Sequence, residues 1–237
     1  MSWEIAWSAI CGVWSQKWSE IMFVSNYMSR PVITVRPETP LAEVRELLRS
    51  HSFRHLPVVD AKQVLIGIVT DRDLRSALPS AFMDEKEKAS YLAKFQASTA
   101  GAIKTEAVYY LNQRATLDDA LLLFDRSRVG ALPVVDDEKR IQGILSIRDL
   151  LSAYRILFGL GEKGSRLIAV RDDGKPKILT RLTEVLERHD IPFTRLVRCM
   201  EQGEGELSTI YIRVHTYNST IIHRVLEEGG FEMVVPG

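Results

Sequence analysis

Residues 56–60 of this chain read Leu-Pro-Val-Val-Asp, and residues 132–136 repeat the same five amino acids 76 positions later. The same offset relates Gly67–Asp73 (GIVTDRD) to Gly143–Asp149 (GILSIRD), so the register is kept without a gap. A repeat that keeps its register predicts two copies of one structural unit within the chain.

Each copy carries the same order of expected elements. In the first copy, Leu41, Val44 and Leu48 recur at the spacing of one helix face. A short strand is expected before this helix, and two β-branched strands and a second helix are expected after it. The expected strands are Val32–Val35, Pro57–Val59 and Leu65–Val69 in the first copy, with Val108–Leu111 as the first strand of the second copy. Each copy therefore predicts a β-α-β-β-α unit.

The C-terminal third of the chain carries a different pattern. Its expected strands are Leu167–Val170, Phe193–Met200, Ile210–Val214 and Phe231–Val235, with helices after the first and third. This β-α-β-β-α-β order is that of the ferredoxin-like fold. Just ahead of it, Gly159, Gly161 and Gly164 spell G-x-G-x-x-G, but they follow a helix rather than a strand, so we interpret them as a linker.

The 237 residues are expected to form an α+β protein of several small domains. The expected segments are an amphipathic N-terminal segment (1–21), the first repeat (22–79), a helical linker (80–98), the second repeat (99–157), a linker (158–165) and the C-terminal domain (166–237). The charges of the helical linker are interpreted as a solvated face.

All four tryptophans of the chain lie in the N-terminal segment. Its apolar residues recur at steps of three or four, as on one helix face: Trp3, Trp7, Ile10, Trp14, Trp18 and Ile21. One interpretation is a helix that packs on the body of the protein or on a partner chain. The others are an interfacial membrane anchor, disfavoured because the polar face lacks a lysine and arginine excess, and a true start at Met22.

Composition argues against several function classes. Lys plus Arg and Asp plus Glu number 31 each, so no net basic field points to nucleic acid or to an anionic membrane. Cys11 and Cys199 are the only cysteines, which fits free thiols in a reducing cytoplasm. No apolar run reaches the roughly 18 residues of a membrane span. We expect a cytoplasmic protein, and no metal site, because the histidines lack ligand spacing.

The runs Thr70–Asp73 and Ser146–Asp149 place a hydroxyl and a carboxylate three residues apart at a helix start. A carboxylate accepts hydrogen bonds from both ribose hydroxyls, and a neighbouring hydroxyl donates or accepts another. The same pattern is that of a capping box, which exists without any ligand. Both interpretations stay open, since a cap fixes the geometry that a ligand would use.

These runs, together with the two Leu-Pro-Val-Val-Asp runs, resemble a pair of cystathionine-β-synthase (CBS) domains over residues 24–155. The resemblance implies an adenosine nucleotide such as AMP or ATP as a regulatory ligand, with no cofactor. It implies nucleotide contacts from Thr34, Arg54, His55, Pro57, Thr70, Arg72 and Asp73 in the first copy and from Tyr109, Ala131, Pro133, Ser146, Arg148 and Asp149 in the second.

The first copy offers the larger and more polar set of contacts, and Tyr109 of the second copy departs from the small polar Thr34. We therefore rank the Asp73 site above the Asp149 site. His55 is interpreted as a structural histidine in preference to a phosphate ligand, because a lone histidine is more often structural.

The C-terminal domain resembles an ACT domain, a family that senses amino acids at paired-domain interfaces. The resemblance implies a ligand turn at Asp173, Gly174 and Lys175, although Lys175-Pro176 departs from the commoner proline-before-glycine pattern. Ligand binding and dimerisation alone both stay open for this domain.

From Met22 onward, the order of two CBS-like repeats and an ACT-like domain resembles the AcuB group of acetoin-utilisation proteins. The resemblance implies a regulatory homodimer with an unidentified protein target. An enzyme is disfavoured, because the sequence holds no P-loop, no G-x-S-x-G and no H-E-x-x-H motif. A dimeric scaffold without ligand, or a regulatory subunit of a metabolic enzyme, is the alternative.

Overall fold

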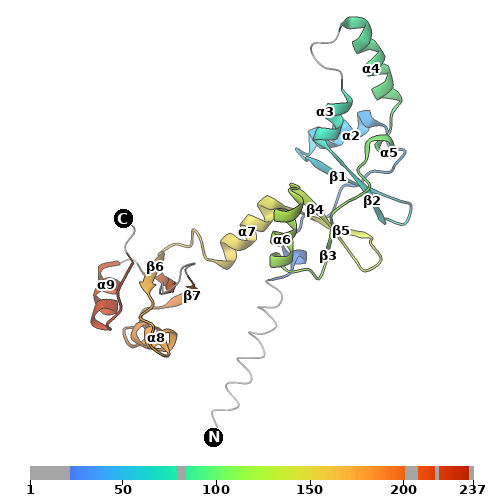
Figure 1. Cartoon of the computed structure of the whole chain (residues 1–237). Coiled ribbons are helices and arrows are strands. Elements are labelled where there is room, and N and C mark those ends of the chain that lie inside the picture. The colour runs from blue at the N-terminus through green and yellow to red at the C-terminus, as the bar shows by residue number, and fades with distance from the viewer. Residues whose placement is uncertain (1–21, 79–83, 201–207, 217–218, 235–237) are drawn as a thin grey trace. The chain divides into compact units, whose positions relative to one another are not determined.

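The computed structural model of the chain describes residues 22–78, 84–200, 208–216 and 219–234 (Figure 1). The chain forms two compact units, Met1–Ala153 and Tyr154–Gly237. The tryptophan-rich segment and the expected start of the helical linker at 80–83 lie outside the described residues.

The first unit holds both repeats. Its elements are η1 (Val24–Asn26), α2 (Leu41–Ser50), β1 (His55–Val59), β2 (Leu65–Thr70), α3 (Asp71–Ala77), α4 (Glu85–Ala97), α5 (Ala100–Ile103), β3 (Leu111–Asn112), α6 (Leu117–Ser127), β4 (Ala131–Val135), β5 (Ile141–Ser146) and α7 (Ile147–Leu157), which ends in the second unit. The linker forms α4, capped by Asp84, and α5 was not expected from the sequence.

The first strand of each repeat differs from the expectation. Residues Val32–Val35 form no regular strand, and only Val35 makes a parallel bridge, to Val58. In the second repeat β3 begins at Leu111, where the expected strand Val108–Leu111 ends. Both predictions place the strand too early in the sequence, because the residues ahead of Val35 and Leu111 run between the two repeats.

Each repeat closes on a small sheet. β1 pairs antiparallel with β2, and β4 pairs antiparallel with β5 while β3 lies parallel to β4 on its other side. In the first repeat α2 and α3 pack on this sheet, with Leu41 and Val44 buried against Leu56 and Val69. The apolar spacing that predicts α2 is thus the spacing of its buried face.

The two repeats exchange their leading segments. Residues 22–29, at the start of the first repeat, hydrogen-bond to the second repeat, and residues 98–105, at the start of the second repeat, hydrogen-bond to the first. The bridges are Ser29 with Ile144 and Thr105 with Ile68, two pairs related by the 76-residue offset. The repeats therefore form one interlocked body about a pseudo-twofold axis.

The starts of α2 and α6 show the same exchange. The backbone N–H of Leu41 donates to the carbonyl of Ser98 at 3.0 Å, and that of Leu117 donates to the carbonyl of Met22 at 2.8 Å. Since the first N–H groups of a helix have no partner within the helix, each bond satisfies one of them from outside. Each helix start is thus fixed by the leading segment of the other repeat.

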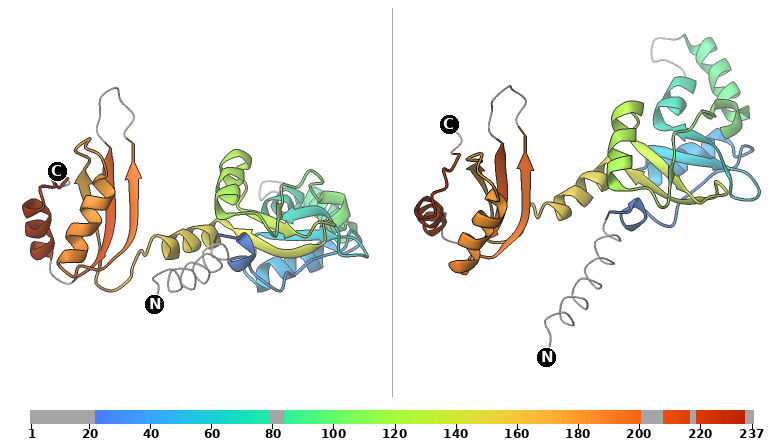
Figure 2. Two further views of the ribbon diagram at one scale, coloured as in Figure 1. Left: turned by 90° about the horizontal axis from the view of Figure 1, so that it is seen from below. Right: turned by 60° about the horizontal axis from the view of Figure 1, so that its bottom comes forward.

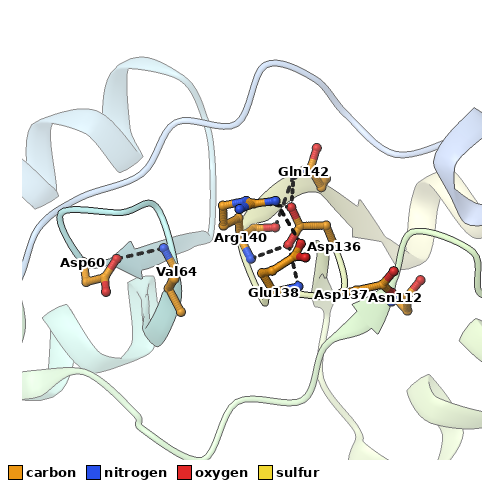
Figure 3. Close-up of polar contacts among 8 residues, drawn as sticks. All are labelled: Asp60, Val64, Asn112, Asp136, Asp137, Glu138, Arg140 and Gln142. Carbon is orange, nitrogen blue, oxygen red and sulfur yellow. Dashed lines mark hydrogen bonds and ion pairs between the residues drawn. The ribbon is translucent and has the colours of Figure 1, made fainter.

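The aspartates that end the two Leu-Pro-Val-Val-Asp runs hold two hairpin turns that lie side by side (Figure 3). Asp60 Oδ1 accepts the backbone N–H of Val64 at 2.9 Å, and Asp136 Oδ1 accepts that of Arg140 at 2.8 Å. Val64 and Arg140 bridge the two turns. Arg140 stands where the first repeat has an aliphatic residue, and its Nε pairs with Asp136 Oδ2 at 2.8 Å.

The second unit contains β6 (Ser165–Arg171), α8 (Ile178–Arg188), β7 (Phe193–Cys199), β8 (Thr209–His215) and α9 (Ser219–Glu228). The sheet order is β6-β8-β7, and both pairings are antiparallel. One core joins the strands to both helices, with Ile212, Leu182 and Leu226 among its buried side chains. The expected closing strand Phe231–Val235 is reduced to one antiparallel bridge of Met233 to Val170, and Val235 lies outside the described residues. This bridge places the last segment beside β6, as in the ferredoxin-like order.

Gly159, Gly161 and Gly164 all have positive φ and lie between α7 and β6, as the linker interpretation requires. Over the ranges described, no helix has the length and apolar character needed to cross a membrane.

Candidate functional site

The Thr70–Asp73 run forms a complete capping box at the start of α3. Thr70 Oγ1 accepts the backbone N–H of Asp73 at 3.3 Å, while Asp73 Oδ2 accepts both the backbone N–H and the hydroxyl of Thr70 at 2.8 Å. Asp73 Oδ1 has no hydrogen-bond partner among the described residues. The cap therefore uses one carboxylate oxygen and leaves the other available.

The second copy repeats this geometry at the start of α7. Asp149 Oδ2 accepts the backbone N–H of Ser146 at 2.8 Å and its hydroxyl at 2.7 Å, and Ser146 Oγ accepts the N–H of Asp149 at 3.3 Å. Asp149 Oδ1 likewise has no partner in the described part of the chain. Both aspartates are partly buried, so the capping interpretation holds at both sites without excluding a ligand.

A third run of this kind, Thr116–Asp119, provides an internal reference. Thr116 and Asp119 form the same capping box at the start of α6, with both bonds to Asp119 Oδ2 at 2.8 Å. Neither residue lines either of the two clefts described next. The capping geometry alone therefore does not mark a ligand site, and the surrounding cleft has to be considered with it.

The first cleft, of about 480 Å³, opens at the Asp73 cap. It is lined by Thr70, Asp71, Arg72, Asp73 and Arg75 around α3, by Arg54, His55 and Ile68, by Thr105, Ala107, Val108 and Tyr109, and by Arg128, Val129, Gly130 and Ala131. Residues 54–75 of this lining belong to the first copy and residues 105–131 to the second, so both copies build this cleft.

The second cleft, of about 360 Å³, opens at the Asp149 cap. It is lined by Ser146, Ile147, Arg148 and Asp149 around α7, by Ile144, by Ser29, Pro31, Val32 and Ile33, by Ser52, Phe53, Arg54 and His55, and by Gly130 and Ala131. The starts of β1 and β4 contribute to both clefts, through four shared residues: Arg54, His55, Gly130 and Ala131.

This arrangement corrects how the sequence groups the site residues. Tyr109 and its neighbours lie with Asp73, whereas Val32 and Ile33 lie with Asp149. The physical reason is the exchange of leading segments between the repeats. The sequence-based ranking of the Asp73 site above the Asp149 site loses its basis, because the contacts counted for one aspartate belong largely to the other.

Three predicted contact residues line neither of the two clefts: Thr34, Pro57 and Pro133. The 76-residue offset also pairs Thr34 with Tyr110, so the departure assigned to Tyr109 is wrong by one position. The remaining predicted nucleotide contacts all line at least one of the two clefts.

The sequence missed the residues that follow α2 and α6. Ser52 lines the second cleft and Arg128 the first, and both have the left-handed backbone conformation, with φ of 55° and 54°. Non-glycine residues rarely adopt this conformation. Neither residue carries a sequence pattern that predicts it, although the two are again 76 positions apart.

The two clefts differ in charge. Four arginines line the first cleft: Arg54, Arg72, Arg75 and Arg128. Arg75 is engaged by an ion pair with Asp71. The second cleft has two arginines, Arg54 and Arg148, and a more apolar wall that includes Phe53 and Ile147. The first cleft therefore has more guanidinium groups with which to bind a polyanionic group.

His55 lies at the start of β1, where the two clefts meet. Burial lowers the pKa of its imidazole, Arg54 lowers that pKa further, and Asp73 opposes both. The ring also lies close to the backbone of Gly130, where a Cβ atom would come within 3.1 Å of Cε1. The structure thus shows a cleft-wall position for His55, where the neutral imidazole is favoured near neutral pH.

The predicted ligand turn of the second unit is held by ion pairs. Asp173 accepts two hydrogen bonds from Arg181 Nη2, at 2.7 and 2.9 Å, and one from the backbone N–H of Lys175 at 3.0 Å. The bond from Arg181 lowers the pKa of Asp173. The buried Asp172 accepts the N–H of Gly174 at 2.9 Å. The carboxylate of Asp173 is therefore already engaged within the turn.

Among the residues that the structure describes, no three His, Cys, Asp or Glu side chains form a group suited to a metal ion. Cys199 is an exposed free thiol, and Cys11 lies outside the described residues.

The CBS domain family matches residues 24–80 and 100–156 of the chain. A CBS domain-containing protein of Dictyostelium discoideum is 32% identical over 130 residues, which cover 55% of this chain and 89% of that protein. The chain belongs to the CBS-domain proteins. An inosine-5'-monophosphate dehydrogenase of Methanocaldococcus jannaschii is 31% identical over 139 residues, or 59% of this chain and 25% of the dehydrogenase. The chain thus spans about a quarter of that relative's length.

The CBS-pair protein CBSX2 of Arabidopsis thaliana shares the fold, with 26% identity, a TM-score of 0.51 and coverage of 58% of this chain and 97% of CBSX2. CBSX2 has also been crystallised in complex with AMP. The similar structures further include an acetoin utilization protein (AcuB) described from Vibrio cholerae, with 25% identity, a TM-score of 0.49 and coverage of 59% and 94%.

Proposed function

We propose that the CBS pair of this chain is a regulatory module that binds adenosine nucleotides, one in each cleft. The observation that carries the proposal is the pair of capped aspartates, Asp73 and Asp149, which each line a cleft and whose Oδ1 atoms have no partner among the described residues. An unpartnered carboxylate oxygen is an acceptor for the ribose hydroxyls. The complex of CBSX2 with AMP supports the choice of ligand class.

The charge difference between the two clefts supports a different ligand for each. Arg72 and Arg128 favour a nucleotide with several phosphates in the first cleft, because guanidinium groups match phosphate oxygens with two parallel hydrogen bonds. The second cleft, with Arg148 and a more apolar wall, suits AMP or a nucleoside with little negative charge. The nucleotide acts here as a regulatory ligand, and no cofactor is invoked.

The proposed role is AcuB-like: a cytoplasmic, homodimeric sensor whose affinity for a protein target changes with bound nucleotide. The order of the two CBS domains and a ferredoxin-like unit supports this comparison. A small molecule at Asp173, Gly174 and Lys175 is the proposed second signal, and binding there would have to compete with Arg181 for the carboxylate of Asp173.

Isothermal titration calorimetry of the full chain with AMP, ATP and S-adenosylmethionine tests the proposal. We expect saturable binding of at least one ligand, and loss of binding in the double variant Asp73→Ala/Asp149→Ala. The matched control is Asp119→Ala, which removes an equivalent capping box outside the two clefts. Absence of nucleotide binding to the unmodified chain would favour the scaffold alternative. An equal loss of binding in the Asp119→Ala control would show that Asp73 and Asp149 act only as helix caps.

A further inference from the structure

The outer face of the second repeat is apolar where that of the first repeat is charged. α6 exposes Leu121 and Leu122, at 48% and 54%, and α7 exposes Ile147 and Leu151, at 46% and 64%. The positions 76 residues earlier hold Arg45, Glu46, Asp71 and Arg75. Figures 1 and 2 show α6 next to the N-terminal half of α7.

Single exposed apolar residues are ordinary, but a group of them on neighbouring helices usually has a partner. Ile147 also lines the second cleft, so the patch available for docking consists of Leu121, Leu122 and Leu151. The charged first repeat shows that the fold itself does not require this patch. There the same face is solvated, and Asp71 and Arg75 pair with each other. The apolar face of the second repeat is therefore a candidate docking surface that the first repeat lacks.

The N-terminal segment 1–21 joins the described structure beside this patch. The carbonyl of Met22 accepts the N–H of Leu117, the first residue of α6, at 2.8 Å, and Val24 donates to Ala115 at 2.9 Å. A helix of 21 residues is about 30 Å long, roughly twice the length of α6 or α7. The segment is therefore attached at the right place and is long enough to cross both helices.

We propose that residues 1–21 dock on the same chain, with their tryptophan face against Leu121, Leu122 and Leu151. The segment supplies an apolar stripe of four tryptophans and two isoleucines, and few charges would be desolvated, namely Glu4, Lys17 and Glu20. The short tether gives the segment an effective concentration in the millimolar range at this face, which favours it over a second copy of the chain.

Because all four tryptophans lie in residues 1–21, tryptophan fluorescence reports on this segment alone. We expect the full chain to emit at shorter wavelength than a synthetic peptide of residues 1–21 and to be quenched severalfold less by acrylamide. The variant Leu121→Arg/Leu122→Glu gives the second repeat the residues of the first, and we expect it to restore peptide-like emission and quenching. The reverse exchange, Arg45→Leu/Glu46→Leu, is the matched control and should change neither.

Since all four substituted residues are on helix surfaces, circular dichroism should show unchanged folding in both variants. Peptide-like emission of the unmodified chain, or short-wavelength emission that survives Leu121→Arg/Leu122→Glu, would overturn the proposal. Emission that shifts with protein concentration would assign the patch to a second copy, and a shift seen only with anionic vesicles would assign the segment to a membrane. A native protein whose intact mass begins at Met22 would also contradict it.

Discussion

The first cleft brings four arginines around its capped aspartate, whereas the second has two arginines and an apolar wall. The capping boxes themselves agree to about 0.1 Å in every hydrogen bond. Two copies of one unit thus keep the group that would hold a ribose and diverge in what would meet the rest of the ligand. The comparison separates a shared anchoring function from cleft-specific selectivity.

The largest expected effect comes from removing one anchor at a time. Asp73→Ala should weaken nucleotide binding in the first cleft by about ten- to a hundredfold, because hydrogen bonds to a charged acceptor contribute about 1.5–3 kcal/mol. Asp149→Ala should do the same in the second cleft only. Calorimetric titration of each variant checks this, and a substitution that weakens both clefts equally would show that the clefts do not act separately.

Loss of the cap costs roughly 1 kcal/mol of stability in its own right. Asp119→Ala is the control for this loss, since it should lower the melting temperature by a similar amount and leave nucleotide affinity unchanged.

The second effect concerns two matched glycines. A Cβ atom at Gly143 would lie 2.2 Å from the Sδ of the buried Met28, whereas one at Gly67 would lie 2.7 Å from Cδ of Lys104. Gly143→Ala should destabilise the protein by about 1–3 kcal/mol in urea unfolding, as overpacking does. Gly67→Ala should cost less, because a lysine side chain yields more readily than a buried methionine. The reverse order would show that the exchanged segments pack differently from one another.

A smaller effect tests selectivity. Arg128→Ala should lower the affinity for ATP about tenfold and that for AMP less, since Arg128 is proposed to favour a nucleotide with several phosphates. Arg148→Ala, in the second cleft, is the comparison variant and should leave ATP binding in the first cleft unchanged. Competition binding with AMP and ATP checks both, and an equal loss for the two nucleotides would contradict the assignment.

The smallest effect is a pH dependence. Because the pKa of His55 is lowered in the folded protein, its contribution to stability is present above the ordinary value near 6.5 and is lost as the pH falls toward the folded pKa. A bound phosphate would raise that pKa, so nucleotide binding should take up protons below pH ~6.5 and tighten about two- to threefold. Calorimetry in buffers of different ionisation enthalpy measures the uptake. His55→Gln should abolish it, and uptake that persists in this variant would assign the proton to another group.

Much of the fold follows from the sequence, because local patterns encode it. The helix spacing of Leu41 and Val44 acts over a few residues, as do the capping boxes at Thr70 and Ser146, and the structure confirms both. The exchange of leading segments could not be predicted, since nothing local to Ser29 or Thr105 says which repeat each will pair with. That exchange decides which residues share a cleft, so the sequence groups the predicted residues wrongly, although most of them line one of the two clefts.

The second unit shows the same limit at its edge. The apolar run from Phe231 predicts a strand, but only Met233 bridges to β6 in the described residues. An edge segment receives hydrogen bonds from one side only, so a short apolar run is not sufficient to fix a regular strand there.

A crystal structure of the full chain with AMP tests the central claim most directly, namely that each capped aspartate is also a ribose anchor. We expect a ribose hydroxyl within hydrogen-bond distance of Oδ1 of Asp73 or Asp149, while Oδ2 still accepts the hydroxyl of Thr70 or Ser146. Nucleotide bound with its ribose away from both aspartates, or an aspartate that leaves its cap to reach the ligand, would contradict the account.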